Sequence, residues 1–144
     1  MSPHDLEHVR RMWAQDRASA HLGIELLEVG VGTDGPRPLG HARTRMRISG
    51  TMVNGHDIAH GGYVFTLADS TFALACNATG RLTVAAGCDI TFVTASRLDD
   101  VLLAEARERL TYGRSGITDV TVVREADGEV VAEFRGRSRS LPPR

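Results

Sequence analysis

Residues 54–80 constrain this chain more than any other stretch, because they join a polar loop, a double glycine and one long apolar run. A helix that is apolar on nearly every side is usually buried in its domain. We therefore expect a buried helix over residues 61–78, with Gly80 ending it as glycines past the last turn commonly do. Its polar residues fall close to one stripe of the helix: Thr66, Asp69, Ser70 and Asn77.

The two ends of this pattern suggest chemistry. The start of a helix carries unpaired N–H groups and a partial positive charge, and His60-Gly61-Gly62 places no bulky side chain over them. A carbonyl oxygen could therefore approach the N–H of Gly61 or Gly62. Asp69 lies about 12 Å further along the axis, at about 1.5 Å per residue. A second, antiparallel copy of the helix would bring Asp69 of one chain near Gly61 of the other.

This pattern resembles the hotdog-fold acyl-CoA thioesterases, and most closely the phenylacetyl-CoA thioesterase (PaaI-like) family. The resemblance extends more weakly over the strands on both sides, from about residue 22 to residue 140. The matching residues are Asn54, His60-Gly61-Gly62, Leu67-Ala68-Asp69, Phe72-Ala73, Cys76-Asn77 and Gly80.

The resemblance implies an α+β hotdog fold over residues 1–144, in which a six-stranded antiparallel sheet wraps one long helix. It implies that Gly61 N–H polarises the thioester carbonyl and that Asp69 is nucleophile or general base. Asn54 would position the attacking group, and His60 would shape the loop beside the thioester. No metal or other cofactor is implied, because coenzyme A is part of the substrate. A homodimer or homotetramer with sites at the dimer interface is expected.

Each of these residues also has a plainer interpretation. Asp69 could face water or cap a loop, the two glycines could serve only helix entry, and His60 could order its loop by a hydrogen bond. Members of the family often carry a Ser or Thr in the strand after the helix. Ala85 and Ala86 stand around that position here, with Thr83 as a weak substitute.

The resemblance also indicates a substrate, namely phenylacetyl-CoA, its hydroxyphenylacetyl relatives or another short or aryl acyl-CoA, in phenylacetate degradation. Phe65 and Phe72 lie seven residues apart, hence nearly on one face of the helix, and Tyr63 lies at its mouth beside Gly62. These residues could flank a flat ring. Alternatively, the two phenylalanines fill the core under the sheet.

The rest of the chain predicts the sheet. Leu6, Val9 and Met12 recur at helical spacing, which indicates one N-terminal helix over about residues 3–20. Residues 39–48 alternate arginine or histidine with small and apolar residues, and so does the last strand. One polar face indicates an antiparallel sheet covered on one side. The expected strands are 22–32, 39–48, 81–95, 101–112, 115–126 and 130–140.

Composition excludes several classes. A net charge of −1 indicates no nucleic-acid partner. No apolar run approaches the roughly 20 residues of a membrane span, and residues 1–8 do not read as a signal peptide, so we expect a cytoplasmic protein. His56 and His60 are four residues apart, as metal ligands on a helix would be, but the glycines around them argue against a helix and no third ligand sits at a usual spacing. Cys76 and Cys88 are expected to be reduced thiols.

The arginine rows 43–47 and 135–139 are expected on the solvated outer face of the sheet. The alternative is that one or two of them hold the phosphates of coenzyme A. Two alternatives to the enzyme also stay open. One is a non-catalytic acyl-CoA-binding protein on the same fold, which would be expected to lack the acid at Asp69. The other is a hotdog dehydratase, which usually needs a histidine that the strands after the helix do not supply.

Overall fold

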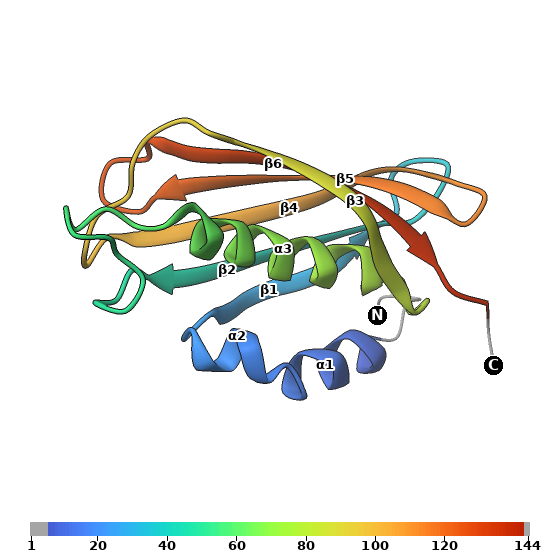
Figure 1. The fold of residues 1–144 in the computed structure, drawn as a ribbon. Coiled ribbons are helices and arrows are strands. Elements are labelled where there is room, and N and C mark those ends of the chain that lie inside the picture. The colour runs from blue at the N-terminus through green and yellow to red at the C-terminus, as the bar shows by residue number, and fades with distance from the viewer. Residues whose placement is uncertain (1–5, 143–144) are drawn as a thin grey trace.

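The computed structural model describes residues 6–142 and has one six-stranded antiparallel sheet wrapped around a long helix (Figure 1), which confirms the expected hotdog arrangement. The strand order is β1-β2-β4-β5-β6-β3. The elements are α1 (Glu7–Ala14), α2 (Arg17–His21), β1 (Glu25–Gly32), β2 (Leu39–Arg47), α3 (Gly61–Asn77), β3 (Thr83–Phe92), β4 (Val101–Tyr112), β5 (Ser115–Arg124) and β6 (Val130–Ser140).

The core lies between α3 and the inner face of the sheet. Leu67, Phe72 and Leu74 of α3 are almost wholly buried against inward residues of the strands. Glycines allow the closest approaches, because a Cβ at Gly40 would overlap the carbonyl of Ala75 on α3. These contacts fix α3 across the sheet.

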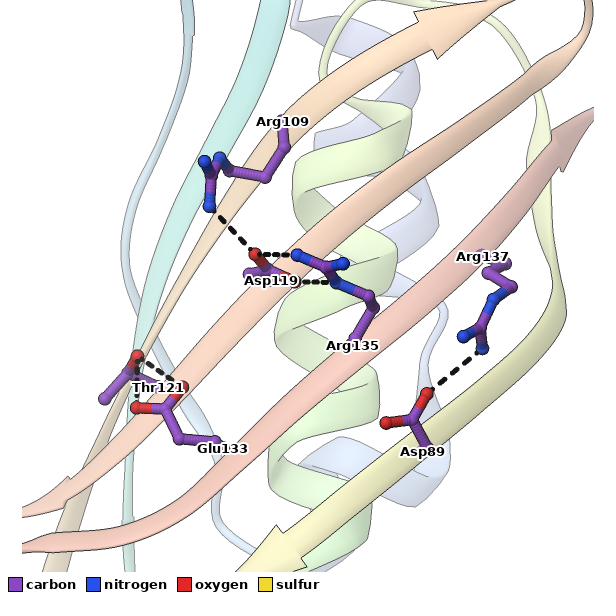
Figure 2. Close-up of polar contacts among 7 residues, drawn as sticks. All are labelled: Asp89, Arg109, Asp119, Thr121, Glu133, Arg135 and Arg137. Carbon is purple, nitrogen blue, oxygen red and sulfur yellow. Dashed lines mark hydrogen bonds and ion pairs between the residues drawn. The ribbon is translucent and has the colours of Figure 1, made fainter.

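The outer face of the sheet carries ion pairs. Asp119 accepts from Arg135 at 2.7 Å and from Arg109 at 3.0 Å, and Arg137 pairs with Asp89 (Figure 2). The second arginine row is paired in the same way: Arg43 with Glu28, Arg45 with Glu25 and Glu125, and Arg47 with Asp99. The solvated outer face expected for both rows is what the structure has.

The single N-terminal helix expected over residues 3–20 is wrong within the described residues, and residues 3–5 lie outside them. Two short helices, α1 and α2, replace it, because Asp16 is the N-cap of a new helix and accepts from Ser19 N at 2.9 Å. Both helices lie beside α3, near β1 (Figure 1).

The other predicted elements agree to within a few residues. The first strand starts at Glu25 rather than residue 22, because Gly23 makes a turn at φ +72°. The strand predicted over 81–95 spans Thr83–Phe92. Within residues 6–142, β3 is an edge strand that pairs only with β6, and its neighbourhood exposes apolar side chains: Leu82, Val84, Phe92 and Val93.

Candidate active site

The start of α3 is open. His60 is its N-cap residue, but the His60 side chain makes no capping hydrogen bond, and the first turn of the helix holds no acid. The N–H groups of Gly61 and Gly62 have no partner among residues 6–142 outside the helix. Helix starts of this kind attract electron-rich groups.

The Phe92 ring packs beside Gly61. A Cβ at Gly61 would meet the Phe92 ring at 2.8 Å, so the ring lies directly beside the helix start. Phe92 is nevertheless 53% exposed. A hollow of about 370 Å³ opens here, and the residues lining it include Ile58, Ala59, Gly61, Val64, Phe92 and Ser96.

Asp69 lies two turns along α3 and is half-buried. Burial raises the pKa of its carboxyl, and the negative charge of Asp16 raises it further. A carboxylate with a raised pKa is a stronger base than an ordinary aspartate and is still ionised above that pKa. Asp69 is therefore suited to activate water or to attack a carbonyl carbon.

One chain does not bring Asp69 to Gly61. The two residues lie eight positions apart on one straight helix, about 12 Å along its axis. A small reacting group cannot contact both within the same chain. The expected need for a second copy therefore stands as a proposal.

Asn54 is engaged mainly with its own loop. Its Oδ1 accepts from His56 N at 2.9 Å and from Ile58 N at 3.2 Å. Its Nδ2 has no partner among the described residues, so this group is available to a ligand. His60 is exposed, and its backbone N–H donates to Met52 O at 2.9 Å, which holds the loop against the helix start.

The aromatic residues of α3 differ in their exposure to solvent. Phe72 is 1% exposed, its ring lies 5.7 Å from that of Phe134, and a Cβ at Gly136 would meet it at 2.5 Å. The Phe72 ring therefore fills the core under the sheet, which was the alternative interpretation of this residue. Phe65 packs edge-on against Phe134 at 5.4 Å but is partly exposed, as is Tyr63.

Sequence reasoning missed three residues of interest. Phe92 and Asp16 approach α3 only through the tertiary fold, so no local pattern marks that approach. Glu108 had a signal, because it occupies an inward position of β4 after Leu102, Ala104 and Ala106. Cys76 and Cys88 are free thiols, as expected.

Among the described residues, none of the helices combines the length and hydropathy of a membrane span. In the same part of the chain, no group of three His, Cys, Asp or Glu side chains could hold a metal ion.

A hollow of about 620 Å³ lies on the outer face of the sheet, lined by residues such as Arg107, Arg109, Asp119 and Glu133. It lies across the sheet from Asp69, so it is separate from the candidate site.

Comparison with known proteins identifies the family. Residues 56–131, which include the start of α3 and Asp69, match the family model of the thioesterase superfamily. The chain belongs to the thioesterase superfamily. It is therefore a thioester hydrolase by family, on the hotdog fold that the sequence predicted.

Thioesterase relatives match most of the chain. The acyl-coenzyme A thioesterase PaaI of Escherichia coli is 33% identical over 141 residues, which cover 98% of this chain and 94% of that protein. The structure of the E. coli PaaI protein, from the phenylacetic acid degradation operon, matches with a TM-score of 0.85 at 32% identity over 94% of this chain and 92% of that one. A structure from Thermus thermophilus matches with a TM-score of 0.78 at 31% identity, covering 88% of this chain and 99% of that one.

Proposed function

We propose that this protein hydrolyses acyl-CoA thioesters to a free acid and coenzyme A in the cytoplasm. The observation that carries the proposal is the pairing of an uncapped helix start at Gly61 with a half-buried acid, Asp69, on a superfamily thioesterase scaffold. The relative named as an acyl-coenzyme A thioesterase supports the substrate class.

In the proposed reaction, the thioester carbonyl oxygen accepts from Gly61 N–H. Negative charge grows on this oxygen as the carbon becomes tetrahedral, and one such backbone donor is worth roughly 3 kcal/mol. Asp69 either takes a proton from the attacking water or attacks the carbon itself, giving an anhydride that water then opens. The C–S bond breaks and the thiolate of coenzyme A leaves and takes up a proton. Asn54 Nδ2 would help to place the attacking group.

The proposed site combines two chains, with Gly61 from one and Asp69 from the other. The edge position of β3 supports this, because an edge strand with exposed Val84 and Phe92, followed by exposed Val93, is suited to pair with another strand. We propose a homodimer with two symmetric sites, either alone or joined as a homotetramer. No cofactor or metal is required by this scheme.

For the acyl group we propose phenylacetyl, hydroxyphenylacetyl or another compact group, which would place the enzyme in phenylacetate degradation. The hollow beside Gly61 is mainly apolar, and the Phe92 ring at its wall can contact a flat substrate ring. Gly62, Tyr63 and Phe65 lie in the same first turns of α3, so they are the proposed substrate-facing residues of the helix.

The test is hydrolysis of a panel of acyl-CoAs by the purified chain, followed by thiol release. We expect kcat/KM for phenylacetyl-CoA to exceed that for palmitoyl-CoA. A ratio below one would overturn the aryl assignment while leaving the thioesterase in place. Tight binding of every acyl-CoA without thiol release would instead favour a non-catalytic binding protein.

A further inference from the structure

A chain of hydrogen bonds joins α2 to α3 beside Asp69. Asp16 accepts from Ser19 N at 2.9 Å and from Ser19 Oγ at 2.6 Å. Ser19 Oγ lies 2.8 Å from Ser70 Oγ, and Ser19 is 1% exposed. The N-terminal segment therefore reaches Ser70, the residue next to Asp69, through a part-buried polar contact.

The direction of these hydrogen bonds is fixed by the carboxylate of Asp16. An ionised carboxylate only accepts, so the single hydroxyl proton of Ser19 points to Asp16. Ser70 must then donate its own proton to Ser19 Oγ. The arrangement orients the Ser70 hydroxyl toward Ser19, which fixes this face of α3 immediately beside Asp69.

A second contact holds the same segment seven residues further along α3. His8 Nε2 lies 2.9 Å from Asn77 Oδ1, and Val9 is fully buried. α1 and α2 are thus fastened to α3 at two separate points. Asp16, between them, is held in place rather than carried on a loose end.

The charge of Asp16 acts on Asp69 directly. After burial, it is the other cause that raises the pKa of the Asp69 carboxyl. The charge of Asp69 in turn acts on two thiols, Cys76 on α3 and Cys88 on β3. Burial raises the pKa of Cys76 to about 12 and also raises the pKa of Cys88, so both thiols are uncharged near neutral pH.

We propose that the N-terminal helices belong to the catalytic centre, with Asp16 as a positioning residue that acts on Asp69 through its charge and through the Ser19–Ser70 contact. The inference rests on the proposed role of Asp69. A second carboxylate near the first makes Asp69 the more basic group, which favours proton abstraction from water. The N-terminal segment thereby takes part in the chemistry.

The test is Asp16→Asn, which removes the charge but keeps a good N-cap, since Asn and Asp cap helices about equally well. We expect the acid limb of the kcat/KM–pH profile to move to lower pH and kcat at neutral pH to fall. Asp34→Asn is the matched control, because it removes the same charge from an exposed loop, and its profile should coincide with that of the wild type. An acid limb that stays in place in Asp16→Asn overturns the proposal.

A second measurement does not depend on activity. Carbon-13 NMR of the Asp69 carboxyl should show a lower titration midpoint in Asp16→Asn than in the wild type or in Asp34→Asn. If the chain releases no thiol from any acyl-CoA but this midpoint moves, the proposed function fails while the coupling holds. If Asp16→Asn lowers the Tm but leaves the titration midpoint of Asp69 unchanged, Asp16 serves only as a helix cap and the inference is overturned.

Discussion

Glu108 Oε1 lies 3.1 Å from the backbone nitrogen of Gly40, whose N–H donates to it inside the protein. Glu108 is only 7% exposed. Burial raises the pKa of this carboxyl to about 7, although the Gly40 hydrogen bond and the charge of Arg81 both act to lower it. Between about pH 4.5 and pH 7 the folded chain therefore holds a proton on Glu108 that an ordinary glutamate would lose.

Glu108→Gln should stabilise the protein at high pH. A carboxyl whose pKa is raised on folding loses stability as pH rises from its ordinary value, 4.5, through about 7. Glutamine cannot ionise and still accepts from Gly40 N–H. We expect the variant to gain up to about 3 kcal/mol at pH 8 and little at pH 4. Urea unfolding at several pH values measures this, and a gain independent of pH would contradict it.

Asp69→Asn should keep the fold and the ligand affinity but lose turnover. The amide has nearly the same shape but can neither accept the proton nor attack the carbonyl. We expect kcat to fall by at least about 100-fold, the lower range for loss of a general base. Thiol release and binding of a non-hydrolysable acyl-CoA analogue are the two measurements. Turnover within a few-fold of the wild type would remove Asp69 from the mechanism.

The two-chain site predicts complementation. A bulky Gly61→Val chain should be inactive, because its side chain would push against the Phe92 ring and disturb the helix start. Mixed with Asp69→Asn chains under exchange conditions, it should recover activity, because one of the two sites in each mixed dimer has both native residues. Sedimentation should show a dimer or tetramer. A fully active monomer would be incompatible with this site.

Gly40→Ala should destabilise the chain severely. Its Cβ would overlap the carbonyl of Ala75, so β2 or α3 must move. We expect a loss of about 3 kcal/mol or more, at the upper end for overpacking. Gly50→Ala is the control, since nothing lies within 4 Å of its added Cβ. It should change the free energy of unfolding by no more than about 0.5 kcal/mol. Equal effects of the two would show that β2 and α3 are loosely packed.

Most of the fold was predictable from sequence because the apolar run of α3 and the alternating residues of the strands each extend over many residues. The apolar run gave α3 nearly to the residue, as Gly61–Asn77 against 61–78. Alternation gave the strands and their faces. The break between α1 and α2 was not predicted, although Asp16 and Ser19 form a local N-cap pattern. The helical spacing of Leu6, Val9 and Met12 favoured one continuous helix instead.

The site was predictable only in part, because its neighbours come from distant segments. The Gly61 helix start and the lone acid Asp69 were readable from one stretch of sequence. That Phe72 turns to the core depends on Phe134, which lies far along the chain. The approach of Asp16 to Asp69 depends on how α2 packs on α3, and the Phe92 contact depends on where β3 ends. The spacing of residues in the sequence does not predict contacts between such distant segments.

Because the start of α3 is uncapped, helix stability and substrate binding favour different residues at position 60. A Ser or Asp in place of His60 would satisfy a first-turn N–H and add about 1 kcal/mol of helix stability. The same oxygen would compete with the substrate for the partial positive charge at Gly61. Selection for heat resistance and selection for turnover therefore pull this position in opposite directions, and a thermostability screen of this chain would be expected to enrich variants that fold better and work worse.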